Sequence, residues 1–174
     1  MTAANTGELQ EQFDRVIREY AAALSRLAAS YEPIVGSREE LVQDIALAIW
    51  KALPHFRGEC SERTFIYRIA HNRALSHVWK RRPSHQPLDE LRESQHPIDP
   101  RPHPEAAAER KDQRVRLLAA IHSLPVAYRQ MIQLLLEELS HAEMAEILGI
   151  TENNVAVRLN RARKALKDAL GTQL

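Results

Sequence analysis

The segment from Ser140 to Leu170 constrains the fold of this chain most strongly, because it predicts two helices joined by a very short turn. Ser140 and Glu143 have the spacing of a capping box, in which side chains satisfy free backbone N–H groups at a helix start. Gly149 ends the first helix, since glycine adopts the left-handed conformation at little cost. Thr151 can cap the second helix. Apolar residues then recur at helical spacing: Val155, Leu159, Ala162 and Leu166.

Three positions in this segment have the spacing of a helix-turn-helix. Ala145 offers a small side chain where the second helix would cross the first, Gly149 makes the turn, and Val155 supplies a buried aliphatic group. The outer face of the second helix is cationic, which suits phosphates and guanine edges. Its bases are Arg158, Arg161, Arg163, Lys164 and Lys167. A solvated hairpin with charges for solubility is the alternative, but spacing, turn and charge together favour DNA binding.

The charges of this 174-residue chain are unevenly distributed, although the formal net charge is only +1. Residues 8–44 contain eight acids and four bases, whereas residues 63–82 contain six bases and no acid. Such asymmetry indicates different partners for the two surfaces. Apolar residues make up 44% of the sequence and aromatic residues 5%, which favours small helical units.

Cys60 is the only cysteine, so no internal disulfide can form and a reducing compartment is expected. Its thiol is either inert or a redox sensor, and the lack of a resolving partner favours the inert thiol. No segment has the apolar length of a membrane span, and the N-terminus has no signal core. We therefore expect a cytoplasmic protein without membrane insertion.

Sequence signals for catalysis are missing. The eight histidines form no metal-ligand spacing with cysteine or carboxylate residues. The chain has neither a phosphate-binding glycine loop nor a nucleophile elbow. The sequence therefore predicts no metal, no cofactor and no enzymatic activity.

The N-terminal part predicts two amphipathic helices. Apolar residues recur at helical spacing from Leu9 to Tyr31, and Pro33 with Gly36 ends that pattern. Ser37 and Glu40 have the spacing of a second capping box, which would start the next helix. The face of that helix opposite its apolar stripe carries Gln43, Asp44 and Leu47. Such a face is usually solvated, and a contact with a partner is the alternative.

A loop from His55 to Ser61, with Gly58 at its centre, precedes a third helix predicted from Thr64 to Lys80. This helix is basic, and amides, hydroxyls and the aromatic Trp79 lie between its bases. Such a helix can hold a nucleic-acid backbone and stack or hydrogen-bond an exposed base. The alternative is a core helix with a solvated basic side, in which Trp79 belongs to the core.

Residues 83–104 contain six of the nine prolines and no periodic apolar pattern, which predicts a flexible linker. Helices are expected again over residues 105–121, with Val115 facing inward, and from Pro125, which suits a first helical position. The predicted fold class is all-α. Two small helical domains, at residues 8–82 and 105–171, would be joined by the proline-rich linker.

Three segments together resemble the bacterial RNA polymerase sigma factors of the extracytoplasmic-function (ECF) group. They read EELVQDIALAIWKAL, HFRGECSERTFIYRIAHNRAL and LPVAYRQMIQLLLEELSHAEMAEILGITENNVAVRLNRARKAL. The resemblance covers residues 13–82 and 108–170, and the order of the segments with a proline-rich linker between them is specific. It implies that the first domain is sigma region two and the second is sigma region four.

The resemblance implies two functions for the first domain. Its second helix would dock on the clamp helices of the largest subunit of core RNA polymerase, through Gln43, Asp44 and Leu47. The loop after that helix would take a flipped base of the minus-ten promoter element, and the basic helix would hold the adjacent strand. The residues implied for minus-ten DNA are Arg57, Gly58, Glu59, Cys60, Arg63, Asn72, Arg73, Ser76, His77, Lys80 and Arg81.

For the second domain, the resemblance implies a recognition helix over residues 151–164 that reads the minus-thirty-five element in the major groove. The residues implied are Thr151, Glu152, Asn153, Asn154, Arg158 and Arg161. The linker would pass near the active-site and RNA-exit channels of the polymerase and tether the two DNA-binding domains. Many relatives are held inactive by an anti-sigma factor, which the resemblance makes a further candidate partner.

The sequence departs from the family pattern at both DNA-binding surfaces. The family often has an acid where Ser76 stands, and Thr, a basic residue and Ser where Asn154, Ala156 and Val157 stand. These differences bear on the preferred bases and leave the predicted fold unchanged. A stand-alone helix-turn-helix regulator is the alternative function, with the N-terminal domain as a sensor or dimerisation module. The basic stretch of residues 63–82 argues against it, because a sensor domain has no need of such a stretch.

Overall fold

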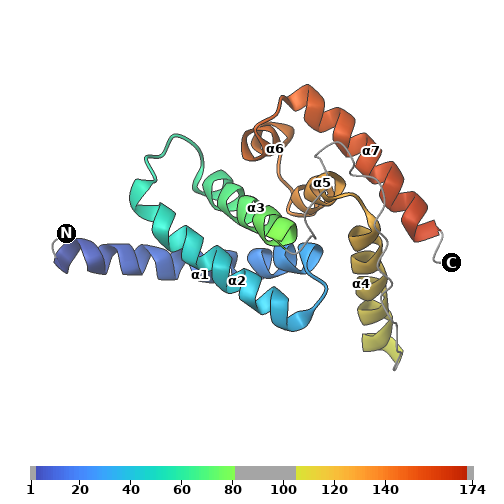
Figure 1. Ribbon diagram of the computed structural model, residues 1–174, viewed down its shortest axis with the longest axis horizontal. Helices are drawn as coiled ribbons and strands as arrows, with labels where there is room; N and C mark the ends of the chain where they lie inside the picture. Colours follow the sequence, from blue (N-terminus) through green and yellow to red (C-terminus); the bar gives the residue numbers. More distant parts are fainter. Residues whose placement is uncertain (1–2, 81–104, 172–174) are drawn as a thin grey trace. The chain divides into compact units, whose positions relative to one another are not determined.

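The computed structural model describes residues 3–80 and 105–171 (Figure 1). Every regular element in these two ranges is a helix, which confirms the predicted all-α fold. The predicted linker at 83–104 lies outside the described residues. The chain separates into two compact units. One contains α1 to α3, and the other contains α4, α5, α7 and most of α6, so each is described by itself.

The N-terminal unit consists of three long helices and one short turn of 3-10 helix. Their bounds are α1, Ala3–Tyr31; α2, Val35–Ala52; η1, Leu53–His55; and α3, Glu62–Lys80. Each of the three long helices packs against the other two. Aliphatic residues at helical spacing fill the space between them, as expected for amphipathic helices. The largest fully buried ones are Leu27, Leu41, Ile45, Ile49 and Ile66.

The predicted capping box of Ser37 and Glu40 is wrong. α2 begins at Val35, and its N-cap residue is Ile34, which makes no side-chain cap bond. Gly36, predicted to end the preceding pattern, therefore lies inside α2. The helix starts early because residues outside it stabilise its first turn. Oε1 of Glu32 accepts a hydrogen bond from the backbone N–H of Ile34 at 2.9 Å.

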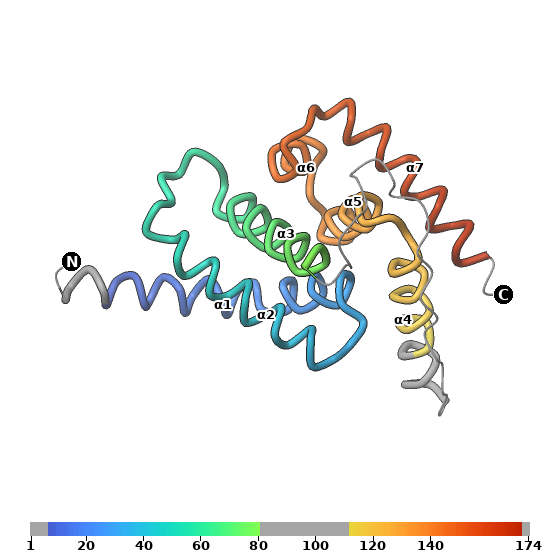
Figure 2. Tube along the Cα trace, viewed as in Figure 1, coloured from blue at the N-terminus to red at the C-terminus, as the bar shows by residue number. Residues whose placement is uncertain are grey.

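The C-terminal unit consists of four helices, of which α7 packs against both α5 and α4. Their bounds are α4, Glu105–Ser123; α5, Val126–Leu136; α6, His141–Leu148; and α7, Glu152–Gly171. Figure 2 follows the trace from α5 through the short α6 into α7. Between α6 and α7, the tight turn predicted from the sequence is present at Gly149, which has a φ of 65°.

The capping box at the start of α6 is confirmed. The backbone N–H of Ser140 donates to Oε2 of Glu143 at 2.8 Å, and the N–H of Glu143 donates to Oγ of Ser140 at 3.2 Å. Two free donors at the helix start are thereby satisfied. The small residue Ala145 and the aliphatic Val155 are both buried, as the helix-turn-helix spacing predicts.

Two smaller predictions, and the alternative that placed Trp79 in the core, differ from the structure. Val115 was expected to face inward, but 43% of it is exposed, because the buried positions of α4 begin later in the helix. Trp79 is not a core residue, since it lies in the last turn of α3 and is 51% exposed. Pro125 is the N-cap of α5 rather than its first helical residue.

Candidate protein and nucleic-acid interfaces

The face of α2 that was predicted to contact a partner is open to solvent within the N-terminal unit. Gln43 and Asp44 are exposed, and Leu47 is 46% exposed. The opposite stripe of α2 is fully buried, which fixes the direction in which these three side chains point. An exposed carboxylate beside an exposed leucine suits a partner surface with both basic and apolar groups.

The loop between η1 and α3 turns at a glycine in the left-handed backbone conformation. Gly58 has a φ of 73°, and Arg57, Gly58 and Glu59 are all exposed. Ser61 ends this loop by capping α3, because its Oγ accepts the backbone N–H of Thr64 at 3.0 Å. The loop is therefore anchored at its junction with the helix, while its centre remains accessible.

Cys60 lies in the same loop and is partly buried. Burial raises the pKa of its thiol, although the nearby Arg68 guanidinium acts in the opposite direction. A raised pKa disfavours the thiolate, which is the reactive form. This supports the interpretation of Cys60 as an inert thiol over that of a redox sensor.

The polar residues of α3 lie on neighbouring faces of the helix. Asn72, Ser76 and Lys80 recur every fourth residue and so share one face. Arg73 and His77 form the adjacent row. Oγ of Ser76 donates to the carbonyl of Asn72 at 2.9 Å, so that hydroxyl is bonded to its own helix. Together these side chains give the second half of α3 a polar surface, where the DNA contacts of this helix were predicted.

His77 is held from the side by a residue that the sequence did not single out. Its Nε2 lies 3.1 Å from Oε2 of Glu32, and the two side chains are only 13% and 7% exposed. The other oxygen of Glu32 accepts the backbone N–H of Ile34, as described above. A contact of His77 with DNA would therefore compete with this pair. Arg81, the next predicted DNA contact after Lys80, lies outside the described residues.

Arg63 lies apart from that polar surface, because nine residues along a helix turn its side chain away from Asn72. Its guanidinium carbon is 5.9 Å from the centre of the Tyr67 ring, a cation–π geometry. Tyr67 is buried. Arg63 is thus placed near the loop at the start of α3 rather than beside the residues at its end.

The N-terminal half of α7 presents every residue that was predicted to contact the minus-thirty-five element. Oγ1 of Thr151 accepts the backbone N–H of Asn154 at 3.3 Å, which caps the helix. The buried stripe of α7 directs the remaining polar side chains outward. The exposed residues are Thr151, Glu152, Asn153, Asn154, Arg158 and Arg161. Asn154, Arg158 and Arg161 lie on one side, at spacings of four and three residues.

Two further properties of the described residues concern membranes and metals. None of the described helices is long and apolar enough to cross a membrane. Within the two described ranges, no three histidine, cysteine or carboxylate side chains gather as metal ligands do.

Family models match both units of the chain. The model for sigma-70 region 2 matches residues 16–83, and the model for sigma-70 region 4 matches residues 114–166. The ECF RNA polymerase sigma-E factor of Escherichia coli strain K12 is 30% identical over 164 residues, which are 90% of this chain and 85% of that protein. The chain belongs to the ECF sigma factors.

Further relatives agree with this membership. The RNA polymerase sigma-H factor of Pseudomonas aeruginosa is 27% identical to this ECF sigma factor over 91% of the chain and 86% of the relative. The solved structure of CnrH in complex with the cytosolic domain of CnrY matches with a TM-score of 0.68 at 23% identity, covering 95% of this chain and 91% of that one. Bartonella quintana RpoE, solved with the anti-sigma factor NepR, matches with a TM-score of 0.69 at 21% identity, over 92% and 98% of the two chains. These two structures support the fold.

Two polar contacts of this ECF sigma factor were not predicted from its sequence. The polar contact of Glu32 with His77 joins positions 45 apart, and the ion pair of Arg15 with Glu62 joins positions 47 apart. Periodicity shows which face of a helix is polar, but it does not show which distant residue faces it. For Glu32, the excess of acids in residues 8–44 was the available signal, because it indicates that some of them have basic partners elsewhere. No such signal pointed to Arg15 with Glu62.

Proposed function

We propose that this ECF sigma factor binds core RNA polymerase through α2 and directs it to promoters with a minus-ten and a minus-thirty-five element. One observation carries the proposal. A single chain combines an exposed helix-turn-helix with a second unit that matches sigma-70 region 2 and carries an exposed α2 face and a polar α3 surface. A stand-alone regulator needs the first unit but has no use for the second.

Gln43, Asp44 and Leu47 would make the contact with the clamp helices of the largest polymerase subunit. The exposed Asp44 carboxylate suits a basic surface, and the exposed part of Leu47 offers apolar area to bury. Charge complementarity of this kind increases the association rate and selects the partner. Such a protein would act in the cytoplasm, where the polymerase is.

The minus-ten element would be held by the loop at Arg57–Cys60 and by α3. Extruding a base costs roughly a few kcal/mol, so a loop that binds the extruded base traps the melted state. The cations of α3 would hold the phosphates of the same strand. Strand separation would be captured by binding alone, so the protein requires no nucleotide hydrolysis and is proposed not to be an enzyme.

Region 4 would read the minus-thirty-five element through the exposed residues of α7. Arginine suits guanine edges and phosphates, whereas asparagine suits adenine. Ala156 and Val157 supply neither hydroxyl nor charge, so the base preference would rest on the side that carries Asn154, Arg158 and Arg161. An anti-sigma factor is a further candidate partner, since one solved protein of this fold is in complex with an anti-sigma factor and another with the cytosolic domain of CnrY.

Binding of the purified protein to sigma-free core RNA polymerase tests the proposal. The wild type is expected to bind tightly, and Asp44→Arg is expected to bind at least about tenfold more weakly, because it places a cation against a basic surface. Glu8→Arg, a charge reversal in the first turns of α1, serves as the matched control and should bind as the wild type does.

Absence of binding by the wild type would contradict the proposal once mass analysis has excluded a copurified inhibitor. A stand-alone regulator would then be the better interpretation. It predicts a dimer that binds palindromic duplex DNA without polymerase. Equal binding by the wild type and Asp44→Arg would instead move the docking surface away from α2.

A further inference from the structure

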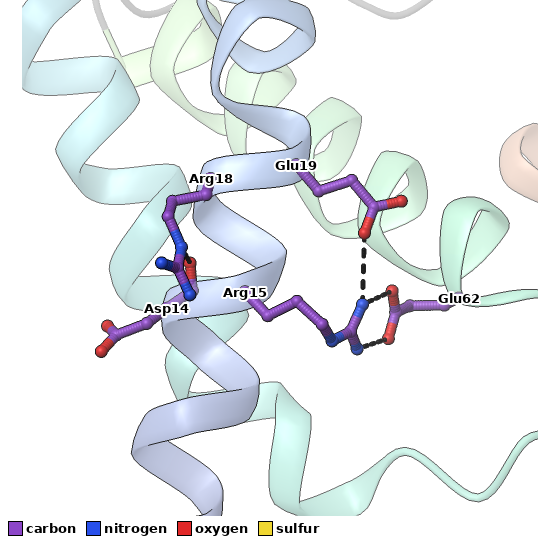
Figure 3. A network of polar contacts seen from close by, with 5 residues as sticks. All are labelled: Asp14, Arg15, Arg18, Glu19 and Glu62. Atoms are coloured by element: carbon purple, nitrogen blue, oxygen red, sulfur yellow. Dashed lines mark hydrogen bonds and ion pairs between the residues drawn. The ribbon is translucent and has the colours of Figure 1, made fainter.

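Arg15 in α1 holds the first residue of α3 with two parallel hydrogen bonds (Figure 3). Its Nη1 donates to Oε1 of Glu62 at 3.0 Å, and its Nη2 donates to Oε2 of Glu62 at 2.6 Å. Nη1 also donates to Glu19, one turn further along α1, at 3.2 Å. A two-pronged guanidinium–carboxylate contact has a fixed orientation that a lysine cannot reproduce.

The position of Glu62 makes this pair relevant to DNA. Glu62 is the first residue of α3, directly after the cap Ser61 and directly before Arg63. It therefore lies between the loop at Arg57–Cys60, which is proposed to bind the minus-ten element, and Arg63, the first proposed DNA contact of α3. An acid at this position is stabilised by the positive end of the helix dipole. It also places a negative charge where a phosphate backbone is proposed to run. From residue 63 to residue 82 the sequence contains no further acid.

A second contact from α1 supports the same end of α3. The ring of Tyr20 packs edge-on against the ring of Tyr67, with ring centres 6.4 Å apart. Tyr67 in turn lies under the guanidinium of Arg63 at 5.9 Å. α1 thus supports Arg63 through the tyrosine pair and neutralises its neighbour Glu62 through Arg15.

We propose that Arg15 is a positioning residue for minus-ten recognition, which holds the Glu62 carboxylate in place and cancels its charge beside the DNA strand. The inference rests on the proposed function, because it assumes that the loop and α3 bind the melted element. Arg15 need not touch DNA. Without it, Glu19 and Glu62 would both lose the guanidinium that they share.

The test uses holoenzyme assembled from core polymerase and the full chain. The probe is a promoter duplex that the wild-type holoenzyme selects from a pool randomised in its upstream and downstream elements. Permanganate reactivity of unpaired thymines measures the opened fraction. Arg15→Ala should lower that fraction roughly three- to tenfold, while core affinity changes less than about twofold. The exposed pair contributes little to global stability, so the thermal midpoint should barely move.

Two readouts separate this role from a merely structural one. Glu62→Gln in the Arg15→Ala background removes the unpaired charge and should restore most of the opening. The difference in opened fraction between Arg15→Ala and the wild type should also decrease as the salt concentration rises from about 50 mM to about 300 mM. Salt screens the repulsion between Glu62 and phosphates. Arg15→Lys, which keeps the charge but loses the two-pronged geometry, should fall between the wild type and Arg15→Ala.

Arg18 supplies the matched control, since it is an exposed arginine of the same helix and its Nε donates to the carbonyl of Asp14 at 3.1 Å (Figure 3). Arg18→Ala should open promoters as the wild type does. Full opening by Arg15→Ala, or equal impairment of Arg15→Ala with and without Glu62→Gln, would overturn the inference. A wild type that binds no core polymerase would overturn the proposed function and this inference with it.

Discussion

The phenolic hydroxyl of Tyr31 lies 2.8 Å from Nδ1 of His71, and both side chains are buried in the N-terminal unit. Tyr31 ends α1 and His71 lies midway along α3, so this hydrogen bond fastens two helices through their interior. Nε2 of His71 is buried and has no protein partner among the described residues. Burial lowers the pKa of His71 from 6.5 to about 3.

Acid should therefore destabilise the N-terminal unit through His71. The unfolded chain binds a proton near pH 6.5, whereas the folded chain resists protonation down to about pH 3. The stabilising effect of the neutral ring is complete above pH 6.5 and is lost progressively as the pH falls from 6.5 to about 3. The free energy of unfolding should fall by up to about 1.4 kcal/mol per pH unit from this group.

Urea unfolding followed by tryptophan fluorescence measures this slope, since both tryptophans, Trp50 and Trp79, lie in the N-terminal unit. His71→Gln should unfold more easily at pH 7 and lose this part of the slope. His55→Gln, which removes an exposed histidine, should keep it. Tyr31→Phe should keep it too while losing about 1–3 kcal/mol, because Nδ1 is left without its partner. Identical slopes for the wild type and His71→Gln would contradict the assignment.

Glu138 has the left-handed backbone conformation that glycine usually occupies at the end of a helix. Its φ is 57°. The N–H of Leu139 donates to the carbonyl of Leu134 at 3.2 Å, and the N–H of Glu138 donates to that of Leu135 at 2.9 Å. This is the hydrogen-bond pattern of a Schellman motif. Glu138→Gly should therefore stabilise the C-terminal unit by about 0.5–1 kcal/mol, since the strain is greater than the entropy that glycine loses.

Hydrogen exchange in peptides from α5 and α6 of the full chain measures this effect, because the C-terminal unit contains no tryptophan. Slower exchange is expected for Glu138→Gly. The control Lys164→Gly places glycine at an exposed position inside α7 and should speed exchange by weakening that helix by up to about 1 kcal/mol. Faster exchange in both variants would show that the Glu138 side chain stabilises the turn.

The sequence predicted the helix-turn-helix of the C-terminal unit well because its signals are local. A capping box spans three residues, a left-handed glycine acts at its own position, and the apolar stripe of α7 repeats within one helix. The Ser37 prediction failed although its local pattern was equally good. There the carboxylate of Glu32, held also by His77 of α3, bonds to Ile34 and fixes the start of α2 earlier in the chain.

In the candidate sites, too, local sequence signals predicted exposure but not contacts between helices. Exposure of Asp44 and Arg158 followed from helical periodicity, because a buried stripe defines the opposite face. The pairs of Arg15 with Glu62 and of Tyr31 with His71 depend on how α1 crosses α3, and periodicity within either helix does not encode that crossing. The roles of these residues in binding polymerase and DNA remain predictions for experiment.

Arg158 should determine base preference in the minus-thirty-five element. It is exposed between Asn154 and Arg161 on one side of α7, where an arginine can donate two hydrogen bonds to a guanine edge. Arg158→Ala should lose about 1–3 kcal/mol of discrimination at one base position. Lys167 is also exposed but lies nine residues after Arg158, so we expect it to contact phosphate and not bases. Lys167→Ala should therefore keep the base preference and only reduce the salt dependence.

Selection by variant holoenzymes from a pool randomised in the upstream element measures both effects. If Arg158→Ala selects the same bases as the wild type and changes only the salt dependence, Arg158 is a phosphate contact, and base readout belongs to its neighbours on α7.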